Sequence, residues 1–380
     1  MRNRFIIILS VLSIFSKIVF SQENPAPLPD IRSSASNLPD ISVIGDFAGS
    51  VTDNKNSASE KGFLVKELEF AFQGYLYPEV RADIFFALHR HGGTLEPELC
   101  EASVSFLKLV DGLSLKTGKI HVDFGKINKI HQHERPYVDQ PVVITNFLGA
   151  HGLVGEGADL SYLLPLPVFV QLAVGAWQIP AHEHEPEEVS VAGLTDSNGN
   201  TIDEILVPGE CGDEFGFGNE AATARIWSSF SLGNMSELEF GVSGAKGNGS
   251  HYSHHQDEAE VSGADITLKI WPSTFKRIIF QNEFLKLKRT VPVGELNRQG
   301  FYSYLGYQLN KYWETGLRYD SSENAFPVIE KTNSVSLVIT NKLTETTKIR
   351  LQYARNLETD INTGYLQLVF GIGPHTHPLQ

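Results

Sequence analysis

The chain has 380 residues, and its 31 Lys and Arg residues against 45 Asp and Glu residues give a net charge of −14. A chain this acidic is not expected to bind nucleic acid or anionic membrane surfaces. Its 41% share of hydrophobic residues is too low for a bundle of membrane helices and too high for a disordered chain.

The N-terminal sequence is typical of an export signal. Arg2 and Arg4 precede an apolar run over residues 5–20, and Val19–Ser21 places small or moderate residues before the expected cleavage point after Ser21. Residues 1–21 are therefore predicted to be a signal peptide, with a membrane anchor as the alternative. Residues 22–40 are rich in Pro and Ser and are predicted to be a flexible periplasmic arm.

From residue 41 onwards the dominant pattern is the two-residue period of β-strands. In residues 345–356, for example, Ile349 and Leu351 share one face, while Arg350 and Gln352 share the other. The segments run to about 9–12 residues, which is the length of a tilted strand that crosses a membrane. One apolar and one charged face suit a barrel with lipid outside and water inside.

The sequence predicts sixteen such strands. In chain order they are 42–50, 62–75, 78–89, 97–107, 112–121, 155–164, 168–178, 220–232, 236–246, 262–271, 275–288, 299–310, 312–320, 332–342, 345–356 and 363–372. We expect the last strand to pair with the first, since closing the sheet leaves no backbone group unpaired in lipid.

The connections between these strands alternate between short and long. The long ones are 51–61, 90–96, 122–154, 179–219, 247–261, 289–298, 321–331 and 357–362. This alternation predicts an all-β fold, a transmembrane antiparallel barrel over residues 41–373 with short periplasmic turns, long extracellular loops and a periplasmic tail at 374–380. A soluble sandwich or propeller would leave the alternation unexplained. The 122–154 loop is the one expected to fold into a pore, although it could hide part of a strand.

Eleven of the 13 His residues lie in or beside four of the long loops, and the other two lie in the predicted tail. Imidazole nitrogens and carboxylates together are typical ligands of Zn²⁺ and related ions. The candidate ligands are His131, His133 and Glu134 in one loop, His182, Glu183, His184 and Glu185 in the next, and His251, His254, His255 and Asp257 in a third. Such clusters favour weak, exchangeable capture of metal ions at a channel entrance. The alternatives are His residues that are only solvated, or that sense pH.

Charged residues at alternate strand positions are predicted to line the lumen. They are Lys116, Arg225, Glu237, Glu239, Asp265, Lys269, Glu314, Arg318, Lys348 and Arg350. Their mixed signs are consistent with a water-filled interior that carries a transverse field. They could equally pair with one another across strands and set no selectivity.

Cys100 and Cys211 are the only cysteines, and both fall on the predicted extracellular side. In an exported chain a disulfide between them is favoured over free thiols, and a role as soft metal ligands is the alternative.

The segments Leu38–Phe47, Leu115–Gly125 and Leu368–Pro378 resemble those of a group of bacterial outer-membrane proteins. The group is often labelled zinc-regulated outer-membrane receptors and is related to the phosphate-selective porins. The resemblance implies a sixteen-stranded porin-like barrel in the outer membrane of a Gram-negative or similar envelope, assembled as a homotrimer.

The sequence thus predicts a porin-like outer-membrane channel that assists uptake of divalent transition metals, zinc first, through acidic, His-rich loops. Zinc would be a transported or loop-bound ion, and no resident cofactor is required. The alternatives are a general or anion and small-solute porin with incidental His residues, and a surface binding or adhesion protein that does not conduct. No motif of a known enzyme class occurs in a suitable context, so no catalytic residue is predicted.

Overall fold

The computed structural model describes residues 39–54, 62–91, 93–179, 187–195, 201–207, 215–249, 257–291 and 294–374. The predicted signal peptide, and almost all of the predicted arm and tail, lie outside these residues. Among the described residues no helix is both long and apolar enough to span a membrane.

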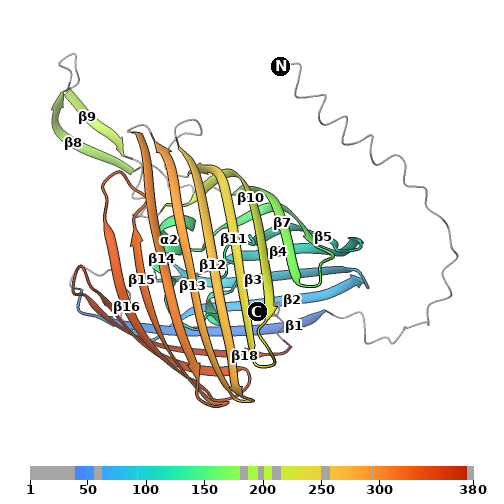
Figure 1. Cartoon of the computed structure of the whole chain (residues 1–380). Coiled ribbons are helices and arrows are strands. Elements are labelled where there is room, and N and C mark those ends of the chain that lie inside the picture. The colour runs from blue at the N-terminus through green and yellow to red at the C-terminus, as the bar shows by residue number, and fades with distance from the viewer. Residues whose placement is uncertain are drawn as a thin grey trace, which may run out of the picture. The chain divides into compact units, whose positions relative to one another are not determined.

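Sixteen antiparallel strands close into a barrel (Figure 1). They are β1 (Asp40–Thr52), β2 (Leu64–Tyr77), β3 (Val80–His91), β4 (Thr94–Val110), β5 (Leu113–His121), β6 (Val154–Leu163), β7 (Phe169–Ile179), β10 (Phe217–Ser231), β11 (Ser236–Gly249), β12 (Glu258–Ser273), β13 (Lys276–Val291), β14 (Gly294–Gln308), β15 (Trp313–Glu323), β16 (Lys331–Lys342), β17 (Thr347–Asn356) and β18 (Asn362–Ile372). Each of the sixteen predicted strands corresponds to one of them, and the predicted fold class is confirmed.

The barrel closes between its first and last strands, as predicted. β1 pairs with β18 from Val43 opposite Ile372 to Thr52 opposite Thr363. The remaining neighbours follow chain order, with β7 next to β10. Closure removes both edges of the sheet, so every barrel strand has a partner on each side.

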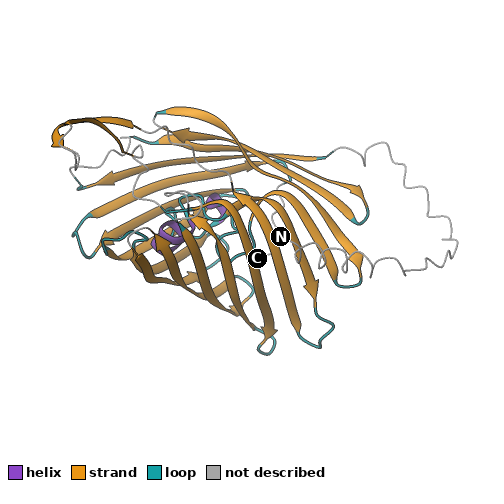
Figure 2. Cartoon of the chain, turned by 90° about the horizontal axis from the view of Figure 1, so that it is seen from above, coloured by secondary structure: helices purple, strands orange, loops and turns teal. Residues whose placement is uncertain are grey.

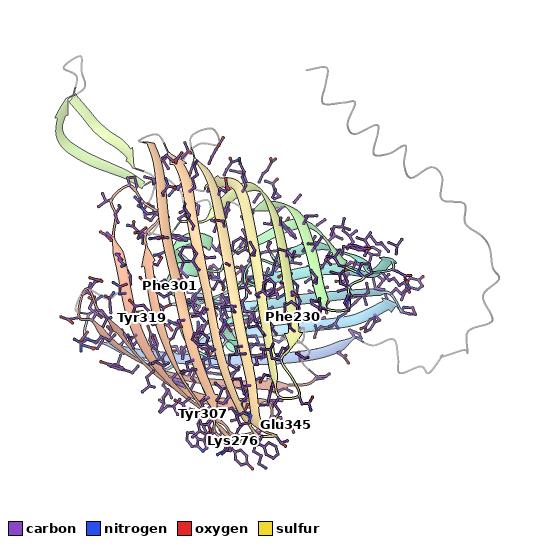
Figure 3. All side chains as sticks on the ribbon, viewed as in Figure 1. Phe230, Lys276, Phe301, Tyr307, Tyr319 and Glu345 are labelled. Carbon is purple, nitrogen blue, oxygen red and sulfur yellow. The ribbon has the colours of Figure 1, made fainter. Side chains whose placement is uncertain are left out.

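The outer face of the barrel is apolar. In β15, for instance, Leu317 is 49% exposed while its neighbours Arg318 and Asp320 are 1% and 0% exposed. The aromatic side chains of Phe301 and Tyr319 also lie on the outer surface (Figure 3). A continuous exposed apolar surface on a closed barrel is the arrangement that a bilayer requires.

The prediction of long loops at 90–96 and 289–298 is wrong. β3 and β4 are joined across positions 92 and 93, with His91 paired to Thr94. β13 and β14 are joined across positions 292 and 293, with Val291 paired to Gly294. The polar residues in 90–96 and 289–298 therefore continue strands, because a strand that leaves the membrane keeps its ladder hydrogen bonds without needing an apolar face.

A further hairpin lies in the predicted 179–219 loop. It consists of β8 (Glu187–Thr195) and β9 (Thr201–Val207), which form a separate two-stranded sheet. In Figure 1 it lies beyond the barrel rim, at the end away from the short β12–β13 turn. These strands are not predicted from the sequence, because they are shorter than a strand that crosses a membrane.

Candidate functional site

Residues 122–153, here called the inner loop, connect β5 to β6 and fold into the barrel. The loop carries a short 3₁₀ helix, η2 (Gln132–Glu134), and a seven-residue α-helix, α2 (Val142–Leu148). In the view from above, the helical segments lie between the strands of the barrel (Figure 2). The prediction that this loop enters the barrel is confirmed, whereas the suggestion that it hides a strand is wrong.

An apolar side of the inner loop explains why it lies inside. Val143, Ile144, Phe147 and Leu148 of α2 are all buried. They belong to one hydrophobic cluster with inner-face residues of β7 and β10–β14, among them Trp177, Leu285, Leu287, Tyr302 and Tyr304. This part of the barrel interior is therefore a packed apolar core, where the sequence reading had expected only water and charge.

Polar contacts fix the loop to the barrel wall at several points. The Gly125 amide donates to Ser243 Oγ at 3.0 Å, and Lys126 Nζ donates to Glu239 Oε2 at 2.5 Å. Further along, the Val138 amide donates to Gln352 Oε1 at 2.7 Å. The start of the loop thus contacts β11, and the middle of the loop contacts β17. The loop therefore crosses the lumen.

Gly125 begins this crossing in a conformation that suits glycine. Its φ is +59°, and a Cβ at this position would meet the carboxylate of Glu283. Glu283 is 1% exposed and accepts a hydrogen bond from the Tyr302 hydroxyl at 3.2 Å, so it is not free to swing away. The tight approach of loop and wall therefore depends on the missing side chain.

The inner loop brings a histidine pair against an acidic part of the wall. One potential ligand atom from each of Glu69, His131 and His133 lies within 4.8 Å of the others, and all three residues are buried. His131 Nδ1 is 2.8 Å from Glu69 Oε2, and His131 Nε2 is 3.2 Å from Glu101 Oε1. The imidazole of His131 is therefore held between a carboxylate of β2 and one of β4.

The surroundings of His131 favour its protonated form when no metal is bound. Burial alone would lower the pKa of the imidazole, but the charge of Glu69 and the hydrogen bonds to Glu101 and Glu69 raise it well above its usual value. Glu134, three residues after His131, behaves differently. Burial raises the pKa of its carboxyl to about 7, against the opposing charges of His131 and Lys348.

The structure changes the composition of the predicted 131–134 cluster. His131 and His133 come together as predicted, and the carboxylate that completes the set is Glu69 instead of Glu134. Glu69 and Glu101 are not among the residues predicted from the sequence. A usable signal was present, since Glu67 and Glu69 alternate with Leu68 and Phe70, which predicts that both carboxylates face the lumen.

Most of the other two predicted clusters lies outside the described residues. This applies to His182, Glu183, His184 and Glu185, and to His251, His254 and His255. Asp257 is described, and it is fully buried. Its two carboxylate oxygens accept hydrogen bonds from Arg289 Nε and Nη2, both at 2.7 Å, which gives it a structural partner that the sequence reading did not foresee.

Cys100 is a free cysteine in this structure, and its predicted partner Cys211 lies outside the described residues. The Cys100 Sγ atom lies 3.4 Å from His89 Nε2. His89 is in turn 3.6 Å from Glu98 Oε2, so the thiol belongs to a small polar group on β3 and β4.

The ten charges predicted to line the lumen occupy the inner face of their strands. Many of them are paired there: Arg225 with Asp265 at 2.7 Å, Lys269 with Glu239 at 2.8 Å and with Glu237 at 3.9 Å, Arg318 with Asp320 at 2.7 Å, Lys342 with Glu314 at 2.5 Å, and Lys116 with Glu101 at 3.5 Å. Arg350 donates to Gln367 Oε1 at 2.5 Å, and Lys348 lies two positions before it on β17.

Two inner-face groups of opposite sign lie on either side of β18. Asp46, Glu67, Glu69 and Glu101 form an acidic arc on β1, β2 and β4, and Arg318, Lys348 and Arg350 form a basic arc on β15 and β17. Gln367 of β18 joins them, because it accepts from Arg350 and donates to both carboxylate oxygens of Asp46 at 2.9 and 2.8 Å. The acidic arc thus holds four carboxylates, whereas the strands of the basic arc also carry the carboxylates of Glu314 and Asp320.

No protein-family model matches the chain. An uncharacterized protein of Aquifex aeolicus (strain VF5) is 26% identical over an alignment of 403 positions, which covers 90% of this chain and 80% of that protein. This relative carries no description of an activity.

Solved structures with the same architecture are outer-membrane proteins. An anion-selective porin from Comamonas acidovorans superposes with a TM-score of 0.54 at 10% identity, covering 88% of this chain and all of that one. OmpT of Vibrio cholerae in its trimer form gives 0.54 at 7% identity over 88% and 100% of the two chains. Salmonella typhi OmpF in complex with daunomycin gives 0.52 at 8% identity over 87% and 97%. The fold, with its apolar outer face, is that of a bacterial outer-membrane porin.

Proposed function

We propose that this porin-fold barrel is a passive channel of the bacterial outer membrane, and that divalent transition-metal cations, zinc first, are its favoured solutes. The observation that carries the proposal is the acidic arc, which faces a histidine-bearing loop inside a closed barrel. A passive pore lowers the barrier for an ion, while ligands along the route raise the local ion concentration.

The acidic arc supports a preference for cations. Of its four carboxylates, Asp46 accepts from the amide of Gln367, a neutral partner that leaves its charge in place. Glu69 and Glu101 share the single imidazole of His131. Fixed negative charge in a confined, low-dielectric setting attracts cations strongly.

The His-rich segments at 182–185 and 251–255 extend this proposal to the barrel entrance. Their sequences offer imidazole and carboxylate groups together, and the chain order assigns them to loops on one side of the membrane. We propose that they capture metal ions weakly and pass them to the lumen. The resemblance to zinc-regulated outer-membrane proteins, relatives of the phosphate-selective porins, agrees with this role.

A general porin, or one for anions and small solutes, is the second candidate. The basic arc favours it, since Arg318, Lys348 and Arg350 present three cationic groups on the inner faces of β15 and β17, on either side of β16. One of the structurally similar proteins is an anion-selective porin. A surface adhesion protein that does not conduct is the third candidate.

We also propose that the chain assembles as a homotrimer. OmpT of Vibrio cholerae, with the same fold, was solved in a trimer form. The mass of the detergent-solubilised protein, measured by light scattering after size exclusion, should equal three chains plus bound detergent. A mass of one chain would contradict this assembly.

Zinc entry into proteoliposomes tests the favoured solute. A zinc-sensitive dye is trapped inside vesicles that contain the protein, and Zn²⁺ is added outside. Wild-type protein should admit Zn²⁺ faster than a variant in which His182, His184, His251, His254 and His255 are Ala. Equal zinc entry, together with rapid sugar uptake in a swelling assay, would contradict the metal preference and favour the general porin.

A further inference from the structure

We infer that Glu69, His131 and His133 form a binding site for one divalent transition-metal ion inside the barrel, where the inner loop meets β2. The inference deepens the proposed function and rests on it for the route by which an ion reaches the site. It adds a second place of binding, separate from the entrance loops.

The three residues have suitable chemistry and position. One ligand atom from each lies within 4.8 Å of the other two, so a single ion could contact all three after small side-chain movements. Glu69, His131 and His133 are 1%, 8% and 3% exposed, which keeps bulk water from competing for the ligands. Two imidazoles and one carboxylate form a set that suits Zn²⁺ and leaves a fourth position open for water.

A second carboxylate supports His131 from the other side of its ring. Nδ1 faces Glu69, while Nε2 lies 3.2 Å from Glu101 Oε1. Glu101 is itself 3.5 Å from Lys116 Nζ. If Nδ1 binds the metal, Nε2–H donates to Glu101, and this outer contact fixes the tautomer and the ring orientation.

One carboxylate oxygen of Glu69 is available to coordinate a cation. Its Oε1 atom is buried and makes no hydrogen bond with any residue that the structure describes. A buried carboxylate oxygen without a partner is costly, and coordination of a cation by this group would remove that cost. This observation points to a ligand independently of the spacing of the two His residues.

A metal ion at this site would connect the inner loop to the acidic side of the barrel wall. The inner loop is attached to β11 through Lys126 and to β17 through Val138. An ion at Glu69, His131 and His133 would attach the same loop to β2, on the acidic side of the lumen. Because three protein ligands leave an exchangeable position, the ion can also depart, which a transport route requires.

Metal binding to the refolded full-length protein tests the inference. Zn²⁺ stoichiometry is measured by calorimetry, and Co²⁺ is used as a spectroscopic probe of the ligand set. The starting protein carries Ala at His182, His184, His251, His254 and His255, so that entrance-loop binding is removed. It should bind one ion per chain, and His133→Ala or Glu69→Gln should abolish that binding and the cobalt absorption.

Glu134→Gln is the matched control, since Glu134 lies in the same short helix but outside the ligand set; it should keep the ion. Glu101→Gln should retain one ion with an affinity about 10–100-fold weaker. An unchanged stoichiometry and cobalt spectrum in both His133→Ala and Glu69→Gln would overturn the inference, as would the absence of any binding in the starting protein. Ion conductance, measured separately, distinguishes failure of this site from failure of the proposed channel.

Discussion

The imidazole of His131 links the inner loop to β2, with its Nδ1 atom 2.8 Å from Oε2 of Glu69. The two residues are 62 positions apart in the chain. At the other side of the lumen, Lys126 of the same loop contacts Glu239 of β11. The loop is therefore held at both sides of the barrel, and changes at either side should have measurable effects.

Glu239 should contribute more to stability than Lys126, its partner in the inner loop. Glu239 contacts both Lys126 and Lys269, at 2.5 and 2.8 Å. Glu239→Gln leaves the largely buried ammonium group of Lys126 without its carboxylate and leaves Lys269 with only Glu237, at 3.9 Å, so it should lower the free energy of unfolding by about 2 kcal/mol. Urea unfolding in detergent micelles, followed by tryptophan fluorescence, measures this change.

Lys126→Met serves as the comparison, because Glu239 keeps Lys269 when Lys126 is removed. Burial lowers the pKa of Lys126 despite the attraction of Glu239, so the loss of its charge also removes a desolvation cost. The expected loss of stability is about 1 kcal/mol or less. A larger loss for Lys126→Met than for Glu239→Gln would contradict this account of the contact.

Gly125→Ala should destabilise the inner loop. The substitution places a Cβ against the buried carboxylate of Glu283 and forces alanine into a left-handed conformation. The conformational part alone costs about 1–2 kcal/mol. Gly244→Ala on β11 is the control, because a Cβ there meets no atom within 4 Å, and its unfolding midpoint should match the wild type. Equal midpoints for both variants would show that the loop does not need glycine at 125.

Much of the fold could be predicted from the sequence. The two-residue period identified all sixteen barrel strands, because the outer face must be apolar in lipid while the inner face need not be. The two-residue period did not identify strand segments outside the membrane, where the outer face need not be apolar. The strands that continue into water at 90–96 and 289–298 have no apolar face, and the short β8–β9 hairpin never enters lipid.

Charge substitutions on the two arcs should shift ion selectivity in opposite directions. Glu101→Gln removes one negative charge from the acidic arc, and Arg350→Gln removes one positive charge from the basic arc. In a KCl gradient across a planar bilayer, the reversal potential should move towards anion preference for Glu101→Gln and towards cation preference for Arg350→Gln. Shifts of the same sign, or no shift in either variant, would contradict a role for the arcs in selectivity.

The predicted disulfide between Cys100 and Cys211 can be tested chemically. A bridge between the two cysteines predicts that alkylation of the protein purified from the envelope modifies neither of them until a reductant is added, and that the mass then increases by two alkyl groups. Alkylation of both thiols without reductant would contradict the bridge and leave Cys100 as a free partner of His89.

The candidate metal cluster was predictable only in part. The His131–Gln132–His133 spacing is visible in the sequence and correctly indicated a pair of imidazoles within one loop. The neighbouring Glu134 was the natural third ligand by spacing, but the loop turns so that Glu69 of β2 takes that position. Which strand faces a folded-in loop depends on barrel closure and on the apolar packing of α2, and neither can be derived from local spacing.

Single-channel recording in a planar bilayer tests the central claim most directly. Purified full-length protein, added to a bilayer in KCl, should produce stepwise current increases of uniform size that persist at constant voltage. The same preparation should show the mobility of a folded barrel on unheated gels. A folded protein that inserts into the bilayer and gives no open-channel current would contradict the channel and favour a surface-binding role.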